Sequence, residues 1–216
     1  MFHPIDYEQW DRRPYYEYYT QQVCCSYSIT CNLDLTKLLP ELKQRGIKLF
    51  PTLIYLTARV VNRHPEFRIA RDEHGRLGFW EELNPSYTVF HPENESFSNI
   101  WSAYREDFSA FYQGVLEDMD CYGKRPGIFA KPGCPPNHFP LSCEPWVSFT
   151  GFNINVFGDS GYLLPMFTFG RYFTQDGKTL LPFSLQIHHA VADGFHSSRL
   201  ILEIQELADA FDAWIG

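Results

Sequence analysis

The segment Gln186–His196, with the letters QIHHAVADGFH, carries the residue types most suited to catalysis in this chain. An apolar run, expected to be a strand, ends at the adjacent residues His188 and His189, and Asp193 follows before a helical segment. An imidazole ordinarily titrates near neutral pH, so a neutral ring can take a proton from a hydroxyl or a thiol. Because neighbouring side chains on an extended backbone point to opposite sides, only one of the two histidines can serve a given site.

The residue types alone leave several roles open for this segment. Asp193 either holds the imidazole or braces and caps the following helix, since aspartate is a preferred N-cap residue. The histidines are either catalytic or buried residues with satisfied hydrogen bonds. A metal site made from His189, Asp193 and His196 is conceivable. No other ligand cluster is identifiable, and the six cysteines contain no C-x2-C pair, so no metal is expected.

The elements that must position these residues are strands and helices that do not alternate strictly. Strands are expected at 20–35, 67–71, 76–81, 86–91, 145–155, 162–173 and 178–188. Helices are expected at 36–45, 51–62, 100–119 and 195–215, with an irregular, Pro- and Gly-rich loop at 124–140. This order predicts an α+β fold, a mixed β-sheet flanked by helices. No repeat or linker interrupts it, so residues 1–216 are expected to form a single catalytic domain.

Composition and charge exclude several classes of partner. The formal net charge is −8 and the densest basic stretch is Lys124-Arg125, so neither nucleic acid nor a membrane surface is an expected partner. No segment is long and apolar enough to span a bilayer, and residues 1–6 lack the pattern of a signal peptide. The protein is therefore expected to be cytoplasmic, with free thiols. Aromatic residues make up 17%, a surplus that predicts a ligand pocket or a subunit interface.

Several motifs, in order along nearly the whole chain, resemble those of chloramphenicol acetyltransferases. HHAVADGFH resembles the HHxxxDG signature of CoA-dependent acyltransferases, and Trp10–Arg13 resembles the W-x-R element of this family. Each motif is weak alone, but the ordered set is specific. Ala192 departs from the family by replacing a cysteine that often precedes Asp-Gly. The further matching segments are 50–51 (FP), 62–68 (NRHPEFR), 87–91 (YTVFH), 95–98 (ESFS) and 145–149 (PWVSF).

The resemblance implies direct transfer of the acetyl group of acetyl-CoA, a co-substrate, to the 3-hydroxyl of chloramphenicol in a ternary complex. His189 would be the general base, with its tautomer fixed by its own backbone carbonyl. The hydroxyl of Ser142 would stabilise the negative oxygen, and Thr168 would assist with a water molecule. Asp193 would pair with Arg12 and support the loop of His189. Ser148, by contrast, is expected to be a structural residue.

The resemblance also implies binding sites and an assembly. Arg171 and Tyr172 would lie beside the CoA channel, and the chain would form a homotrimer with each active site between two subunits. The alternatives are a CoA-dependent O- or S-acyltransferase with a different small acceptor, and a non-catalytic ligand- or metal-binding protein. The wall of the acceptor pocket would consist of Tyr18, Tyr19, Val23, Cys25, Phe97, Phe129, Ile154, Val156 and Met166. Taken singly, Ile154, Val156 and Met166 are more typical of core positions.

Overall fold

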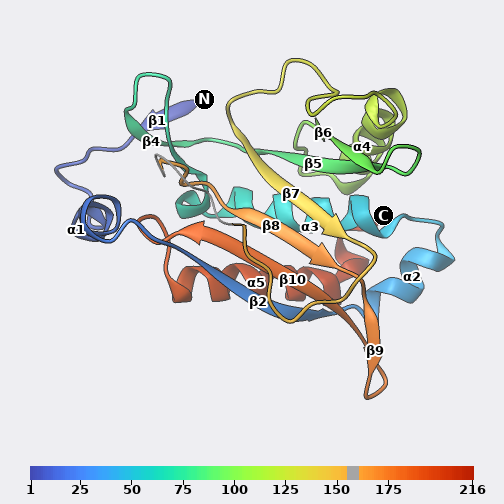
Figure 1. Ribbon diagram of the computed structural model, residues 1–216. Helices are drawn as coiled ribbons and strands as arrows, with labels where there is room; N and C mark the ends of the chain where they lie inside the picture. Colours follow the sequence, from blue (N-terminus) through green and yellow to red (C-terminus); the bar gives the residue numbers. More distant parts are fainter. Residues whose placement is uncertain (155–160) are drawn as a thin grey trace.

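The computed structural model describes residues 1–154 and 161–216 and is built around a mixed sheet of seven strands (Figure 1). The strands run in the order β2-β10-β8-β7-β5-β6, and β9 pairs with β10 off this path. β7 is parallel to both of its neighbours, whereas the other pairs are antiparallel. The strands are β2 (Ser26–Asp34), β5 (Asn84–His91), β6 (Ser96–Trp101), β7 (His138–Glu144), β8 (Met166–Gly170), β9 (Phe173–Gln175) and β10 (Lys178–His188).

A second, three-stranded antiparallel sheet lies near the N-terminus, in the order β1-β4-β3. Its strands are β1 (Phe2–Pro4), β3 (Ile69–Arg71) and β4 (Leu77–Trp80). Short 3-10 helices at Pro65–Arg68 and Phe211–Ala213 and a π-helical turn at Tyr18–Gln22 complete the elements. The α-helices are α1 (Arg13–Glu17), α2 (Leu38–Gln44), α3 (Leu49–Arg63), α4 (Phe108–Tyr122) and α5 (Gly194–Asp209).

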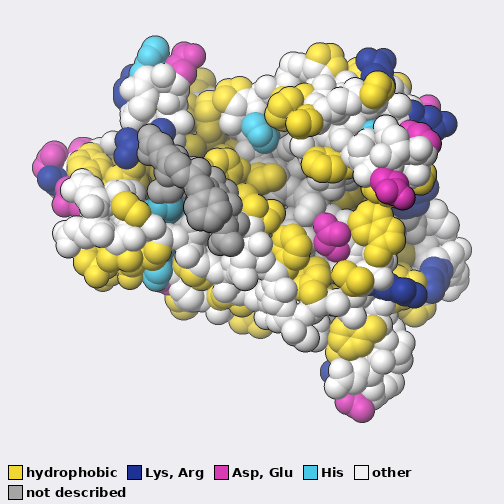
Figure 2. All heavy atoms as spheres, in the orientation of Figure 1, with side chains coloured by type: hydrophobic (Ala, Val, Ile, Leu, Met, Phe, Trp, Pro, Cys, Tyr) yellow, Lys and Arg dark blue, Asp and Glu magenta, His cyan; other side chains and the backbone are white. Residues whose placement is uncertain are grey.

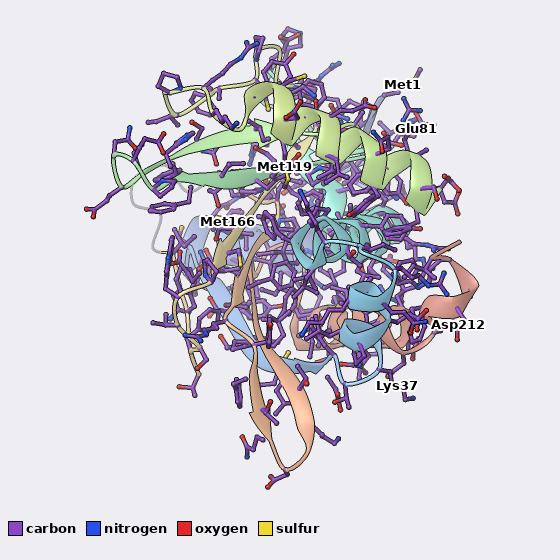
Figure 3. The ribbon with its side chains drawn as sticks, turned by 90° about the vertical axis from the view of Figure 1, so that its right-hand side faces the viewer. Met1, Lys37, Glu81, Met119, Met166 and Asp212 are labelled. Atoms are coloured by element: carbon purple, nitrogen blue, oxygen red, sulfur yellow. The ribbon has the colours of Figure 1, made fainter. Side chains whose placement is uncertain are left out.

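Helices α3 and α5 lie side by side behind the large sheet (Figure 1). The sequence of α3 is apolar nearly all round, and the helix is buried along most of its length, as expected for a helix enclosed by other elements. Seen from the side, α4 forms a further layer above α3, and Met119 on α4 packs against the core (Figure 3). No helix within 1–154 and 161–216 has the length and apolar character needed to cross a membrane.

The fold class is the α+β arrangement that the order of elements predicts, but several local expectations are wrong. The strand expected at 162–173 is instead two short strands, β8 and β9, with a break at residues 171–172. The strand expected at 20–35 begins only at Ser26, because residues 18–22 continue α1 as a π-helical turn. The helix expected at 100–119 begins at Phe108, where the Asp107 carboxylate caps it by accepting from the Ala110 amide at 2.8 Å. Residues 96–101 form the strand β6 instead.

The strand expected at 145–155 is also wrong, because the strand of this region is β7, which ends at Glu144. The segment that follows is irregular and is held by side chains of β10 instead of a backbone ladder. Gln186 makes two hydrogen bonds to the backbone of Ile154, at 2.9 and 2.5 Å, and the Ser184 hydroxyl donates to the Phe152 carbonyl at 2.8 Å. Amide and hydroxyl side chains thus satisfy backbone groups that a neighbouring strand would otherwise satisfy.

Candidate active site

The two adjacent histidines at the end of β10 face different surroundings, as the alternation of an extended backbone predicts. His188 is buried, with 3% of its surface exposed, and its Nδ1 accepts a hydrogen bond from the Ala190 amide at 3.2 Å. Burial and the neighbouring His189 lower the pKa of His188, which favours the neutral ring. The ring is part of the packed interior. His189 is only partly buried and begins a turn, with its amide donating to the Cys25 carbonyl at 2.9 Å.

The imidazole of His189 lies between two tyrosine rings. Tyr19, on the π-helical turn, stacks on it with ring centroids 4.0 Å apart and planes 5° apart. Tyr27, at the start of β2, contacts it at 4.9 Å, and its hydroxyl is 2.6 Å from the hydroxyl of Ser197 on α5. The ring is therefore gripped by two elements that are far from it in the sequence. Nothing in the spacing of residues 18–27 indicates this arrangement, and Tyr27 is absent from the sequence-based set.

The Nδ1 atom of His189 is buried and has no hydrogen-bond partner among the residues that the structure describes. The backbone carbonyl of His189, which the family resemblance assigns to this nitrogen, accepts a hydrogen bond from Arg12 at 3.1 Å. The fixing of the tautomer by that carbonyl stays a prediction. Because Nδ1 is enclosed, the accessible part of this ring is on its other side.

Arg12 ties the turn that carries His189 to the N-terminus of α5. Its guanidinium donates to the carbonyls of His189 and Ala190, at 3.1 and 2.9 Å, and to the Asp193 carboxylate at 3.1 Å. Only 15% of the Arg12 side chain is exposed, so these bonds are shielded from water. The geometry is that of a brace on the backbone of the turn.

Asp193 fills two of the roles that its residue type left open. It caps α5 by accepting from the Phe195 amide at 3.0 Å, and it pairs with Arg12 and with the His196 ring. Burial raises the pKa of the Asp193 carboxyl, but hydrogen bonds from Arg12 and His196 outweigh it and hold the pKa below its ordinary value. Asp193 thus stays ionised, and its carboxylate points toward Arg12. Among the described contacts, no hydrogen bond joins it to the His189 ring.

Ser142 and Thr168 are paired across the parallel strands β7 and β8. Their hydroxyl oxygens are 3.0 Å apart, and Thr168 is buried with 2% exposed. The polar row continues across the sheet, because Thr168 pairs with Ser184 of β10, whose hydroxyl is 3.3 Å from that of Thr30 on β2. A row of small hydroxyl side chains therefore crosses the centre of an otherwise apolar sheet.

A cavity of about 710 Å³ opens beside Ser142, between β5, β6 and the segment that follows β7. Its wall is mostly apolar, and apolar side chains gather on this face in Figure 2. Phe97 and Ile154 line it, as the resemblance implied for an acceptor wall. Trp146 also lines it and packs edge-on against Phe90 at 4.8 Å. Trp146 is absent from the acceptor wall that the resemblance implied, although this residue lies in the matching segment 145–149.

Ser142 and His189 are not brought together within one chain. Ser184 of β10, in register with Thr168 and Ser142, lies five residues before His189, which directly follows the last residue of β10. At about 3.3 Å per residue, the two side chains are separated by about 16 Å along the sheet, apart from their sideways offset. No single hydroxyl of a substrate can contact both groups across that distance. The chain thus presents two half-sites, one around His189 and one around Ser142.

The remaining sequence-predicted residues divide between these half-sites or lie elsewhere. Tyr18, Tyr19, Val23 and Cys25 belong to the His189 half-site, on the turn before β2. Phe129 is 78% exposed and is bridged to Asn99 of β6, next to the Ser142 half-site. Met166 begins β8 and lines a small hollow of about 20 Å³ with His188. Val156 lies outside the described residues.

Arg171 and Tyr172, predicted to lie beside a CoA channel, are exposed in the link between β8 and β9. The amide of Arg171 donates to the Val147 carbonyl at 2.8 Å, which places this link beside the segment that follows β7. Ser148 is exposed in that irregular segment. Arg171 is therefore on the side of the molecule that carries the Ser142 half-site, and no contact joins it to His189 among the described residues.

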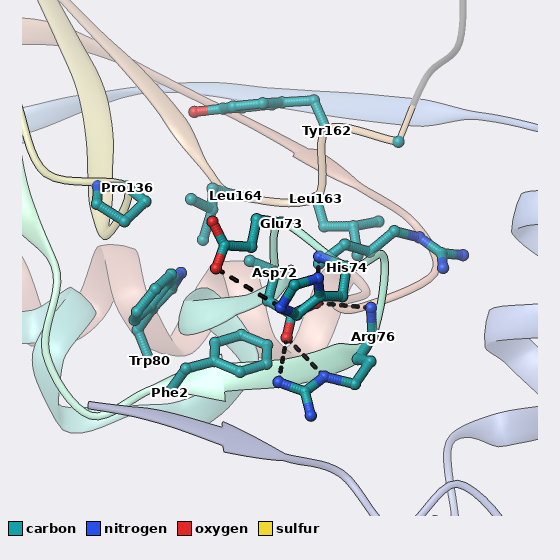
Figure 4. A pocket seen from close by; sticks show the side chains of 13 residues that line it. Phe2, Asp72, Glu73, His74, Arg76, Trp80, Pro136, Tyr162, Leu163 and Leu164 are labelled. Atoms are coloured by element: carbon teal, nitrogen blue, oxygen red, sulfur yellow. Dashed lines mark hydrogen bonds and ion pairs between the residues drawn. The ribbon is translucent and has the colours of Figure 1, made fainter.

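A second cavity, of about 470 Å³, lies beside the small sheet and contains none of the sequence-predicted site residues (Figure 4). Among its charged side chains, Arg76 and Asp72 are joined at 2.7 Å, and Arg71 donates to the Gly75 carbonyl at 3.0 Å. In the part of the chain that the structure describes, no group of three or more His, Cys, Asp or Glu side chains is arranged to hold a metal ion.

Known proteins of one family match this chain over nearly its whole length. The family model for chloramphenicol acetyltransferase matches residues 1–205. A chloramphenicol acetyltransferase of Clostridium perfringens is 52% identical over 215 residues, which cover 100% of this chain and 98% of that protein. One of Clostridium butyricum is 50% identical and covers 99% of this chain and 98% of its own length.

Solved structures agree at the level of the fold. A chloramphenicol acetyltransferase structure superposes with a TM-score of 0.86 at 24% identity, covering 96% of this chain and 100% of that one. The dihydrolipoamide acetyltransferase of Azotobacter vinelandii superposes with a TM-score of 0.64 at 17% identity, covering 88% and 84%. The fold is thus that of the CoA-dependent acyltransferases, and the chain belongs to the chloramphenicol acetyltransferase family.

Proposed function

We propose that this protein transfers the acetyl group of acetyl-CoA directly to the 3-hydroxyl of chloramphenicol. Full-length relatives that are 52% and 50% identical and bear this activity in their names support the reaction. The observation that carries it is the setting of His189, whose ring is stacked on Tyr19 while its backbone is braced by Arg12. Such a grip holds an imidazole in one orientation, as proton transfer to a positioned base requires.

In the proposed mechanism His189 is the general base. Its neutral ring takes the proton of the 3-hydroxyl through Nε2, because Nδ1 is enclosed. The hydroxyl oxygen forms a bond to the thioester carbonyl carbon, and the carbonyl oxygen becomes negative. The Ser142 hydroxyl donates to that oxygen, and Thr168, 3.0 Å away, orients Ser142. Collapse of the tetrahedral species breaks the carbon–sulfur bond, and the CoA thiolate takes the proton back from His189.

The donor to the negative oxygen is expected to supply a large share of the rate. Removing one preorganised donor of this kind ordinarily lowers the turnover number by about 10²–10³-fold. General-base catalysis ordinarily contributes about 10²–10⁴-fold. His189 and Ser142 are therefore the two residues whose removal is expected to cost most, and the two half-sites must meet during turnover.

We infer that they meet between copies of this chain, in a homotrimer with His189 of one subunit facing Ser142 of the next. The separation of about 16 Å within one chain supports an intersubunit site. Exposed aromatic side chains around the Ser142 half-site support it as well, since such rings are enriched at interfaces. Phe97, Phe129 and Trp146 are 52%, 78% and 52% exposed in the single chain.

The proposal also covers the binding sites of the two substrates, the domain and the cellular compartment. Arg171 and Tyr172 would flank the path of acetyl-CoA, and the acceptor would lie against the aromatic walls of both half-sites. The whole chain would act as one catalytic domain, which its continuous hydrophobic core supports. The six cysteines, all free thiols, are compatible with the reducing cytoplasm, where acetyl-CoA is available.

A thiol-release assay tests this function. Purified protein is incubated with acetyl-CoA and chloramphenicol, free CoA is followed, and the site of acetylation is read by NMR. The 3-deoxy analogue of chloramphenicol should release no thiol. His189→Ala should lower the turnover number by about 10²–10⁴-fold, whereas the exposed His74 provides a matched control in His74→Ala.

Three outcomes of this assay would change the assignment. A rate equal to the blank would overturn the proposed function. Acetylation of another small alcohol or thiol, with chloramphenicol left unmodified, would point to a different acceptor on the same machinery. Near-normal turnover by His189→Ala would remove His189 from the role of base.

A further inference from the structure

The Pro- and Gly-rich loop of residues 123–137, between α4 and β7, carries Phe129 of the proposed acceptor wall. The loop runs along the edge strand β6, where the Asn99 amide donates to the Ile128 carbonyl at 2.6 Å and the Ala130 amide donates to the Asn99 carbonyl at 3.1 Å. Residue 129 is thus fixed through its backbone, while its ring is 78% exposed. An aromatic ring held outward in this way is presented to something outside the single chain.

Lys131, two residues after Phe129, ties the same loop to α4. Its Nζ atom is 2.6 Å from the Asp118 carboxylate, and only 14% of the Lys131 side chain and 17% of the Asp118 side chain are exposed. The ammonium group also lies over the ring of Trp101, 4.1 Å from the centroid. The indole nitrogen of Trp101 donates to the carbonyl of Pro132 at 3.3 Å. Burying the Lys131 ammonium group costs free energy unless the charge is paired. The ion pair with Asp118 therefore favours this one position of the loop.

The ion pair is anchored in turn to the core. The second oxygen of Asp118 accepts a hydrogen bond from the Ser102 hydroxyl at 2.7 Å, and that hydroxyl is 2.7 Å from the buried hydroxyl of Tyr87. Tyr87 is fully buried on β5. The chain of contacts thus runs from the buried side chain of Tyr87 on β5, through Asp118 of α4, to the loop beside Phe129. None of these groups belongs to the two half-sites.

We propose that the Asp118–Lys131 pair is a positioning clasp that fixes Phe129 for binding of the acceptor, and so determines the affinity for chloramphenicol without touching it. The proposal rests on the proposed function. With the clasp closed, the ring of Phe129 is ordered before the acceptor arrives, so binding does not have to order it. With the clasp open, binding of chloramphenicol must order the loop, while acetyl-CoA binding and the chemical step stay unaffected.

Steady-state kinetics of Lys131→Met test the clasp. The KM for chloramphenicol should rise about tenfold, the effect of re-ordering one or two side chains. The turnover number should stay within about twofold and the KM for acetyl-CoA should be unchanged, because the clasp acts on the acceptor alone. Lys124→Met, an exposed lysine of the same loop, is the matched control and should match the wild type. Lys131→Arg should restore most of the affinity.

A simple loss of stability would give a different kinetic pattern. It would reduce the amount of active enzyme and lower the apparent turnover number with both KM values unchanged, and this result would overturn the clasp. An equal rise of both KM values would overturn it as well. The double variant Asp118→Asn/Lys131→Met removes both charges, so no unpaired charge is left buried, and its KM for chloramphenicol should still be raised.

A double-mutant cycle with Phe129→Ala tests whether the clasp acts through this ring. If it does, adding Lys131→Met to Phe129→Ala should raise the KM for chloramphenicol by less than twofold, since the ring it positions is already gone. Independent, additive effects would overturn the proposal. The cycle compares variants with one another, so it is insensitive to small uniform changes in expression or activity.

Limited proteolysis gives a readout that needs no turnover. Within the loop trypsin can cleave after Lys124 alone, because Arg125 and Lys131 each precede a proline. Lys131→Met therefore removes no cleavage site, and it should speed cleavage after Lys124 several-fold. Unchanged cleavage would overturn the clasp even if the enzyme is active. A wild type that fails to acetylate chloramphenicol would instead overturn the proposed function, and the cleavage rate would still decide on the clasp.

Discussion

Ser142 and His189 lie about 16 Å apart along the sheet of one chain, because Ser142 is in register with Ser184 and His189 is five residues further along the chain, just past the end of β10. If both groups act on one substrate, as proposed, a second copy of the chain must complete the site. Each copy would then lend its imidazole to one neighbour and receive one from the other. This arrangement can be tested without a structure of the assembly.

Mixed assemblies of two inactive variants should regain activity. Ser142→Ala and His189→Ala should each be slower than the wild type by about 10²-fold or more. When the two are co-expressed with different tags, random assembly should pair an intact His189 with an intact Ser142 at about one site in four. Doubly tagged trimers exclude both inactive homotrimers and have one competent site out of three, so they should show about a third of the wild-type rate. Mixed assemblies that form but stay inactive would mean that each site lies within one subunit.

The brace formed by Arg12 should affect stability and rate together. Arg12→Met removes donors to His189, Ala190 and Asp193 and leaves those acceptors unsatisfied. The free energy of unfolding should fall by about 2 kcal/mol, and Tm should fall by roughly 4–8 °C. The turnover number should drop by about 10–100-fold as the His189 turn shifts. Thermal melts and thiol release measure both effects.

Arg13 provides the control, because it is adjacent in sequence but pairs with Glu8 and Glu17 at the surface. Surface ion pairs contribute about 1 kcal/mol or less, so Arg13→Met should leave the rate and Tm near the wild-type values. If Arg12→Met kept the wild-type Tm, the brace would contribute nothing to the turn, and Asp193 would be merely a helix cap.

How far the sequence predicts this site depends on the range of the contacts. His188 points into the core and His189 away from it, and this difference follows from the alternation of side chains along an extended backbone, which is a local property of the sequence. The pairing of Arg12 with Asp193, some 180 residues apart, was implied by family resemblance alone, because no local rule connects them. The contacts of Tyr19 and Tyr27 with His189 do not follow from the sequence, since residues 20–25 have the composition of a strand, whereas residues 18–22 form a π-helical turn.

The errors in secondary structure have the same origin. Residues 145–154 are rich in apolar and aromatic side chains, which favours a strand, but Ser184 and Gln186 of β10 bind their backbone groups and leave the segment irregular. Residues 96–101 were assigned in part to a helix because the helical spacing of α4 was extended backward past Asp107, its cap. In both regions contacts made across the fold outweigh the local preference.

The tyrosine beside His189 on β2 offers a graded test of how the imidazole is held. Tyr27→Phe keeps the ring contact and loses the bond to Ser197, so the turnover number should stay within about threefold. The buried Ser197 hydroxyl is left unsatisfied, which should lower stability by about 1–3 kcal/mol. Tyr27→Leu removes the aromatic face as well and should lower the turnover number about tenfold, with smaller changes in either KM.

Comparison of the two variants separates the effects of the ring and the hydroxyl. Should Tyr27→Leu be as active as Tyr27→Phe, the ring of Tyr27 would have no part in orienting His189, and the stacking of Tyr19 would hold it alone. The pH profile of the turnover number is a second measurement on both Tyr27 variants. If Tyr27 merely fills space, its replacement should leave the acid limb of that profile, which the base sets, unchanged.

The buried neighbour of the proposed base should make stability depend on pH. Burial lowers the pKa of His188 below its ordinary value of 6.5, so the folded protein keeps this ring neutral where the unfolded chain takes up a proton. The unfolded state then binds more protons, and the free energy of unfolding falls as the pH drops below 6.5. The contribution of His188 is complete above that pH and is lost progressively as the pH falls through the lowered pKa.

Replacing His188 by asparagine removes this titration while keeping an acceptor for the Ala190 amide. Urea denaturation at about pH 8 and about pH 5 should therefore show a smaller loss of stability for His188→Asn than for the wild type. His74→Asn, the same substitution at an exposed histidine, is the control. If the stability of His188→Asn fell with decreasing pH as steeply as that of the wild type, His188 would not be the group whose burial opposes protonation.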